Sequence, residues 1–205
     1  ALTGTSSSPV PNKPSVLWSH TVGKKIVSSP VISRGMVVIG GSGVFALSVS
    51  NGKRLWSFPS SNSFDAPPLI HDGAVYIGDI AGTFYSFDLA GGAVRWKYTT
   101  DEQFAGSANA VPGKGLIVAG CYDNRLYAFD ARGNVAWKFE TDNYINGSAA
   151  VSEDRIVFGG CDGILHALSF SGEKRAAIEV ESYIPSSPAV ISARAYTGNY
   201  GGYFI

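Results

Sequence analysis

The 205-residue sequence is poor in cysteine, in charge and in long apolar runs, and each shortage excludes a class of protein. Two cysteines are too few for a disulfide framework. The 16 basic and 16 acidic residues balance, so the composition gives no electrostatic footprint for nucleic acid or for an anionic membrane. No run reaches the roughly 18–20 apolar residues of a membrane helix, so we expect no membrane insertion. No segment keeps a helical period, which excludes helical solenoids.

A repeated block stands out against these shortages. Segments 52–56, 92–96, 133–137 and 172–176 each begin with glycine and end at the same slot, about 40 residues apart. Tryptophan fills this slot in four of five copies, as Trp18, Trp56, Trp96 and Trp137, whereas the fifth copy has Ala176. A period of this length indicates stacked supersecondary units that bury their apolar faces only against one another.

The third copy shows what each unit contains. Residues 115–120 form a continuous apolar run, typical of a strand buried on both faces, and residues 125–130 and 135–139 alternate as half-buried strands do. The small-residue segment 107–111 precedes them, and Gly133 lies in a turn. Four strands in each repeat predict an all-β fold, a β-propeller of four-stranded antiparallel blades. A β-sandwich would not need five matching blocks.

The block 124–137, which runs Asn-Arg-Leu-Tyr-Ala-Phe-Asp-Ala-Arg-Gly-Asn-Val-Ala-Trp, resembles the repeats of quinoprotein-like propellers, whose hallmark is Ala-x-Asp-x-x-Thr-Gly-x-x-x-Trp. The resemblance extends over nearly the whole chain from Trp18 onward. It implies that the repeat tryptophans, Trp18, Trp56, Trp96 and Trp137, are structural and pack on the neighbouring blade. The blade junction at Ala176 is then expected to be the weakest.

The phase of the repeats at the two ends predicts how the ring closes. Residues 16–22 read as a fourth strand with no first three strands before it, and the chain stops in a third strand. We therefore expect five blades, closed by the N-terminal strand completing the last blade. The alternative is a fragment of a seven- or eight-bladed propeller. The expected organisation is a Ser/Pro-rich linker at 1–15 and a propeller at 16–205, with repeats at 23–58, 59–99, 100–140, 141–180 and 181–205 plus 16–22.

Aligning the copies gives two rings of positions on one face, where loops of a rigid scaffold are the default functional surface. The first ring has a large apolar residue in every copy, read as a contact between blades: Ile26, Phe64, Phe104, Ile145 and Ile184. The second ring is aligned as Gly41, Asp79, Cys121, Cys161 and Asn199. Cys121 and Cys161 are read as buried structural thiols rather than a disulfide or a zinc site.

The residues flanking these rings vary in chemistry, which is how a repeated frame builds an asymmetric binding surface. The candidate binding face consists of Asp65, Gln103, Tyr122, Asp123, Tyr144, Asn146, Tyr183 and Tyr200. Exposed tyrosine is typical of interaction surfaces. The preferred function is a non-catalytic scaffold for protein–protein interaction, or an accessory or sensor domain. A ring that binds a glycan or small ligand is the alternative.

A quinone-dependent dehydrogenase fragment is the second alternative, and it rests on the family resemblance alone. The family's quinone enzymes add long loop insertions, a calcium ion and a catalytic aspartate, and the loops here are short. The sequence has no phosphate loop, no nucleophile elbow and no zinc motif. We therefore expect no catalysis, no quinone and no calcium, a protein partner, and a secreted or periplasmic location, with a cytoplasmic domain of a larger protein as the alternative.

Overall fold

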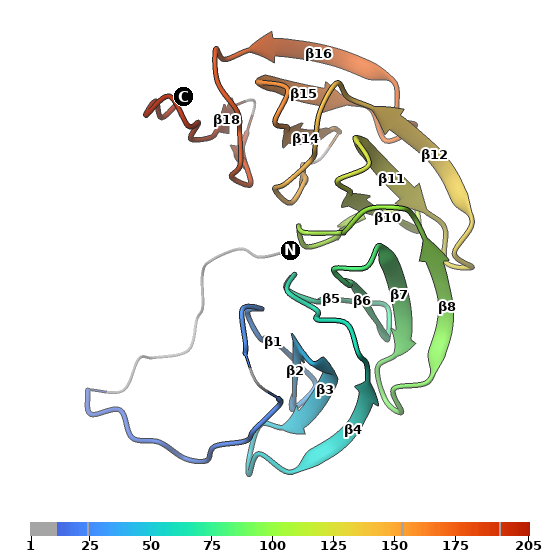
Figure 1. Cartoon of the computed structure of the whole chain (residues 1–205), viewed down its shortest axis with the longest axis vertical. Helices are drawn as coiled ribbons and strands as arrows, with labels where there is room; N and C mark the ends of the chain where they lie inside the picture. Colours follow the sequence, from blue (N-terminus) through green and yellow to red (C-terminus); the bar gives the residue numbers. More distant parts are fainter. Residues whose placement is uncertain (1–11, 24, 153, 193) are drawn as a thin grey trace.

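The computed structural model describes residues 12–23, 25–152, 154–192 and 194–205, and every regular element in them is a β-strand. No membrane-spanning helix occurs in this part of the chain. The strands form four four-stranded antiparallel sheets and a two-stranded one, arranged in an arc with the outermost strand of each full sheet on the perimeter (Figure 1).

Each full sheet is built from four strands that are consecutive in the chain. The first two sheets are β1 (Val31–Ser33), β2 (Met36–Gly41), β3 (Gly43–Ser48), β4 (Arg54–Pro59) and β5 (Leu69–His71), β6 (Ala74–Gly78), β7 (Thr83–Asp88), β8 (Val94–Thr99). The next two are β9 (Asn109–Val111), β10 (Leu116–Gly120), β11 (Arg125–Phe129), β12 (Val135–Glu140) and β13 (Ala150–Val151), β14 (Ile156–Gly159), β15 (Ile164–Leu168), β16 (Lys174–Glu179). The two-stranded sheet contains β17 (Ala189–Ile191) and β18 (Arg194–Tyr196).

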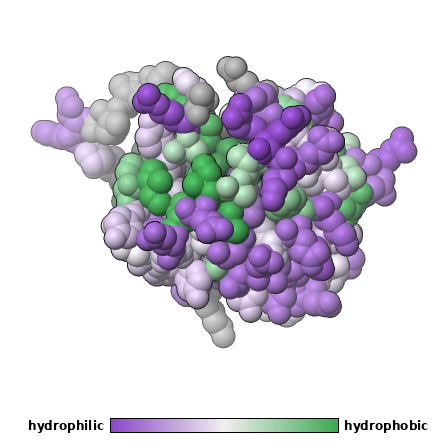
Figure 2. All heavy atoms as spheres, turned by 90° about the horizontal axis from the view of Figure 1, so that it is seen from above, coloured by the Kyte–Doolittle hydropathy of each residue, from purple (hydrophilic) through white to green (hydrophobic). Residues whose placement is uncertain are grey.

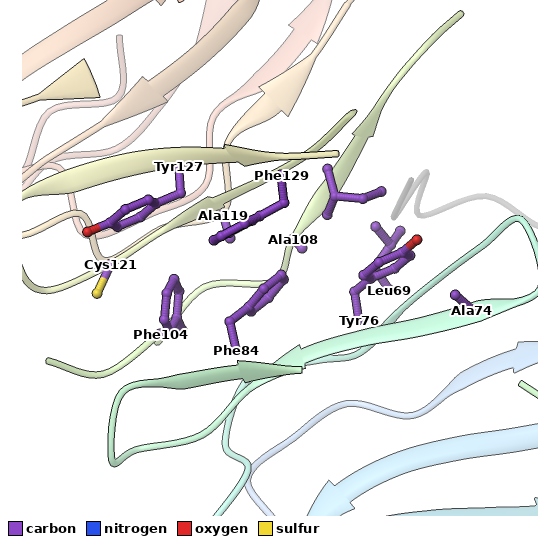
Figure 3. Packing of buried hydrophobic residues seen from close by; sticks show 11 residues of the cluster. Leu69, Ala74, Tyr76, Phe84, Phe104, Ala108, Ala119, Cys121, Tyr127 and Phe129 are labelled. Carbon is purple, nitrogen blue, oxygen red and sulfur yellow. The ribbon is translucent and has the colours of Figure 1, made fainter. Parts of the chain in front are cut away.

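The core lies between adjacent sheets rather than inside one. Phe84 of the second sheet stacks on Phe129 of the third, with ring centroids 5.2 Å apart, and Phe104 and Tyr127 pack beside them (Figure 3). The central strands are therefore apolar on both faces, because each face is covered by a neighbouring sheet. This arrangement explains why a single repeat could not be stable alone.

Each tryptophan of the repeat docks on the sheet that follows it in the chain. The Trp56 indole donates a 2.8 Å hydrogen bond to the carbonyl of Leu89 and lies over Gly92, where an added Cβ would come within 2.6 Å of the ring. Gly92 has φ = 73°, so it supplies both the turn and the close approach. The same hydrogen bond joins Trp18 to Val49, Trp96 to Ala131 and Trp137 to Phe170.

A β-bulge recurs beside the four slots that lie in full sheets. The register between the third and fourth strands shifts at Ala46/Leu47, Ser86/Phe87, Ala128/Phe129 and Ala167/Leu168. A bulge adds one residue to one strand and re-aims the side chain next to it. The bulge also occurs opposite Ala176, so the fifth slot has the same backbone conformation as the others but lacks the indole.

The predicted fold class is confirmed: the sheets are antiparallel, four-stranded and arranged as propeller blades. Closure by the N-terminal strand is not confirmed. Residues 16–22 form no strand, and the last sheet has only β17 and β18, extended by a bridge between Gly198 and Phe204. Trp18 docks on the first full sheet, as the fourth-strand tryptophan of a preceding blade would, so its position is compatible with closure. The five-bladed ring stays a prediction.

Two further expectations have mixed outcomes. Four residues of the apolar ring are buried between blades, but Ile26 is 51% exposed, because the contact is made with the preceding blade and the described residues offer none there. Residues 1–11 of the expected linker lie outside the described residues, and residues 12–15 form no strand.

Candidate functional site

The candidate site lies on what we call the loop face. It comprises the loops that lead into the first strand of each blade (residues 60–66, 100–106, 141–147 and 180–186) and the hairpins between second and third strands (79–83, 121–125, 160–164 and 199–203). These segments are tied together by a repeated set of backbone hydrogen bonds. Four hairpin amides donate to the lead-in loop of the same blade: Ile80 to Ser63, Tyr122 to Gln103, Cys161 to Tyr144 and Tyr200 to Tyr183.

A second set of hydrogen bonds links each lead-in loop to the preceding blade. The amide of Ile145 donates to the carbonyl of Cys121, and that of Ile184 donates to the carbonyl of Gly160. The apolar side chain then packs against a glycine at the end of the preceding second strand. An added Cβ at Gly120 would meet Ile145 Cγ2 at 2.4 Å. The backbone of the loop face is therefore a rigid frame, and it fixes the positions from which the variable side chains extend.

Tyrosines from neighbouring blades meet on this frame. The rings of Tyr122 and Tyr144 stack in parallel across a blade junction, with centroids 5.0 Å apart and an angle of 4° between their planes. The Tyr122 hydroxyl donates a 2.7 Å hydrogen bond to Asn146 Oδ1, which fixes the stack. Burial raises the pKa of Tyr122, with smaller contributions from nearby Cys161, Tyr200 and Tyr144. Tyr200, two blades further along, is thus close to the stack.

The structure thus brings part of the predicted binding face together. Tyr122, Tyr144, Asn146 and Tyr200 form one group, and Tyr183 joins it through its backbone bond to Tyr200. Gln103 lies directly beside this group through its carbonyl. Asp65 lies apart from it, in a hollow of about 490 Å³ lined by Lys25, Ser42, Ser61, Asn62 and Ser63.

Asp123 is turned into its own hairpin. Its carboxylate accepts hydrogen bonds from the Tyr127 hydroxyl at 2.5 Å and from the Arg125 amide at 3.2 Å. Asp162 holds the next hairpin in the same way, through the Ile164 amide at 3.1 Å and His166 Nε2 at 2.8 Å. These carboxylates shape the loop face from below and are not free to meet a ligand.

The Asp162–His166 pair is a feature that sequence reasoning missed. Both side chains are buried, and the imidazole stacks on Phe158 with ring centroids 5.0 Å apart. The i, i+4 spacing of Asp162 and His166 repeats that of Asp123 and Tyr127, and this equivalence was the available signal. The pair lies in the junction between the third and fourth blades, where it has a structural role.

The thiols correct the predicted second ring. Backbone hydrogen bonds make Gly160, not Cys161, the equivalent of Cys121, because Ile145 donates to Cys121 and Ile184 donates to Gly160. Cys161 instead corresponds to Tyr122 and Tyr200. Cys121 is buried, its Sγ donates to the Glu102 carbonyl at 3.1 Å, and burial raises its pKa to about 12. Within the described residues, no three histidine, cysteine, aspartate or glutamate side chains are placed to hold a metal ion.

The sequence matches a family model described as outer membrane protein assembly factor BamB, at residues 12–63 and 40–187. A BamB of Nitrosomonas eutropha is 34% identical over 97 residues, which is 42% of this chain and 23% of that protein. A quinohemoprotein alcohol dehydrogenase ADH-IIG of Pseudomonas putida is 30% identical over 122 residues, 51% of this chain and 17% of that protein. A serine/threonine-protein kinase AfsK of Streptomyces griseus is 29% identical over 130 residues, 58% of this chain and 16% of the kinase.

Solved structures match over more of the chain. The crystal structure of BamB from Moraxella catarrhalis superposes with a TM-score of 0.81 and 21% identity, over 92% of this chain and 60% of that one. A computationally designed protein, Ika8, superposes with a TM-score of 0.75 and 16% identity, over 85% of this chain and 56% of that one. At these identities the likeness shows the fold alone. The chain spans less than a quarter of the length of the curated relatives it matches.

Proposed function

The chain belongs to the PQQ-repeat propeller family described as outer membrane protein assembly factor BamB, and from this premise we propose that it is a non-catalytic scaffold that binds a protein partner through its loop face. The observation that carries the proposal is the frame of backbone hydrogen bonds that links the loops of three blades and supports the Tyr122–Tyr144 stack across one of their junctions. A rigid surface binds without first ordering its side chains, so little of the binding free energy is lost.

Composition also supports a protein partner. The face combines tyrosine with serine, asparagine and glycine, as binding loops of antibodies do, because tyrosine offers a large amphipathic surface with few rotatable bonds. The family model and the relative from Nitrosomonas eutropha are described as outer membrane protein assembly factors, which supports a place in the cell envelope, in line with the secreted or periplasmic location expected from the sequence.

Site-specific photo-crosslinking in the producing organism tests the proposal. A photoreactive phenylalanine analogue at Tyr144 is expected to crosslink a discrete protein band, identified by mass spectrometry. The same analogue at Asp72, on the opposite face, is the matched control because this side chain is 84% exposed. Absence of a Tyr144-specific product under native expression would contradict the proposal.

The dehydrogenase alternative receives its own test. Calcium needs about six to eight oxygen ligands around one point, whereas Asp123 and Asp162 each serve the hairpin of their own blade. This donor set does not favour a calcium-supported quinone. Pyrroloquinoline quinone with calcium is expected to leave the thermal unfolding of the protein unchanged. A ligand at a hundred times its dissociation constant adds about 2.7 kcal/mol to the free energy of unfolding, so binding would be visible as a higher Tm.

A further inference from the structure

We propose that the tyrosine group of the loop face, together with the carboxylates around it, recognises an arginine-bearing extended segment of the protein partner. This inference rests on the proposed function and names the chemistry of the partner. The group consists of Tyr122, Tyr144, Asn146, Tyr183 and Tyr200, and we call it the tyrosine platform.

The platform offers aromatic surface that is held open. Tyr122 is half-buried and braces Tyr144, which is 47% exposed, while Tyr200 is 73% exposed. Asn146 uses its Oδ1 to accept the Tyr122 hydroxyl, so the stack cannot rotate without breaking that hydrogen bond. A planar guanidinium stacks on a tyrosine ring and gains from the negative face of the ring. The platform therefore presents surfaces of the kind that guanidinium groups bind.

Charge is distributed unevenly over the molecule, although the totals balance. Exposed acidic side chains on the loop face are Asp65, Asp101, Glu102, Asp142 and Glu181. The basic side chains described on these loops and on the first lead-in segment are Lys25 and Arg125, and Arg125 is already paired with Glu140 at 3.0 Å and Asp123 at 3.6 Å. The loop face is thus acidic, and complementary charge both steers and orients a cationic partner.

The opposite face has the reverse balance. Among the described residues, its hairpins and the adjoining strand ends carry ten basic side chains against five acidic ones, and three of the ten, Arg95, Arg155 and Arg175, are paired with acids of their own hairpins. A cationic segment is therefore attracted to one face and repelled from the other. The fold separates the two sets of charges. The hairpins between second and third strands lie on the loop face, whereas the hairpins between first and second and between third and fourth strands lie on the opposite face.

The polar groups favour a peptide over a glycan. Glycan hydroxyls need fixed acceptors close to the aromatic surface. The carboxylates of the two hairpins beside the stack, Asp123 and Asp162, are already engaged by Tyr127 and His166. What the platform offers at its surface is tyrosine hydroxyls and the Asn146 amide, which donate to the unpaired carbonyls of an extended peptide. The outer carboxylates are left to pair with guanidinium groups.

A direct binding measurement tests the inference. The probe is a short fluorescein-labelled peptide of alternating arginine and glycine, followed by fluorescence anisotropy, with the glutamate–glycine peptide and chito-oligosaccharide as comparison ligands. We expect the arginine peptide alone to bind, and added salt to weaken it. Tyr144→Ala should weaken binding roughly fivefold, and Asp142→Asn should also weaken it. Tyr144→Phe should keep most of the affinity because it keeps the ring.

Asp72→Asn is the matched control, since it removes an exposed carboxylate from the opposite face. Unchanged thermal unfolding shows that each variant is folded. The inference is overturned if Asp72→Asn weakens binding as much as Asp142→Asn does, if the arginine peptide does not bind, or if only the oligosaccharide binds. A partner that still crosslinks at Tyr144 and ignores the arginine peptide would retain the proposed scaffold function and overturn this inference alone.

Discussion

The glycine at the end of a second strand allows the next blade to pack closely against it. Gly120 faces Ile145 across a junction, and an added Cβ would lie 2.4 Å from Ile145 Cγ2, closer than real carbon contacts. Equivalent approaches join Gly78 to Phe104 and Gly159 to Ile184. The small residue is therefore required by packing, whereas the sequence alone suggests only a turn.

We expect Gly120→Ala to lower the free energy of unfolding by about 1–3 kcal/mol, because an overpacked core must shift side chains or backbone. Urea denaturation followed by tryptophan fluorescence measures the change. The matched control is Gly91→Ala: Gly91 is exposed, and its added Cβ would meet no atom closer than 3.8 Å. Equal losses in the two variants would contradict the packing argument.

The buried thiol gives a prediction about pH. Burial is the main cause that raises the pKa of Cys121 from 9.0 to about 12. Between these values the unfolded chain loses a proton that the folded chain keeps, so Cys121 makes the free energy of unfolding fall as pH rises through this interval. Below pH 9 its contribution is constant.

Alkylation by iodoacetamide checks this prediction, because the thiolate is the reacting species. In a Cys161→Ser background, we expect Cys121 to react roughly tenfold more slowly in the folded protein for each unit by which its pKa is raised. Urea should abolish the difference. Equal rates in native buffer and in urea, read by mass spectrometry, would contradict the burial of this thiol.

Among the blade junctions, we expect the one at the fifth slot to be the weakest. Without an indole, Ala176 borders an apolar hollow of about 220 Å³ whose walls include Val157, Ile178 and Val190. All of β16 is exposed, in contrast to the partly buried outer strands before it. Figure 2, which views the molecule from the side that carries β16, shows hydrophobic residues gathered at the surface amid polar ones.

We expect Ala176→Trp to stabilise the last junction by placing an indole where the other repeats have one. Hydrogen exchange should be fastest in β17 and β18 of the parent protein and should slow there in the variant. Ala177→Trp is the control, because successive residues of a strand point to opposite faces and this alanine pairs with His166 rather than with Ala167. Equal protection in both variants would show that the slot is not special.

The repeat predicts the strands, but it does not predict their contacts. Alternation, glycine turns and the recurring tryptophan are local signals, and they were sufficient for the blade and its order. The equivalence of Cys121 and Cys161 was wrong by one residue, because short segments align equally well in two ways until backbone hydrogen bonds fix the register. The Tyr122–Tyr144 stack joins residues of different blades, so only the packing of the sheets could reveal it.

At the scale of the whole molecule, each sheet depends on its neighbours in the chain. Contacts between sheets join β1 to β5, β9 to β13 and β13 to β17. Stability in such an array is close to a sum of terms for each unit and each junction, so a damaged junction should release the units beside it and leave distant ones intact. Trp56 is the most buried of the docking tryptophans, which makes its junction the best place to test this.

We expect Trp56→Ala to cost about 3–5 kcal/mol at its own junction and to raise hydrogen exchange in β1–β8 while β9–β16 keep their protection. Trp137→Ala is the matched variant and should move the loss to β9–β16, because its indole docks at Phe170. The expected closure by residues 16–22 would give a different result, since a ring held from both sides resists opening at one junction. Protection lost evenly over all blades in both variants would contradict the open array and favour the closed ring. The pattern of hydrogen exchange thus decides whether each docked tryptophan stabilises only its own blade junction or whether all of them stabilise one closed ring together.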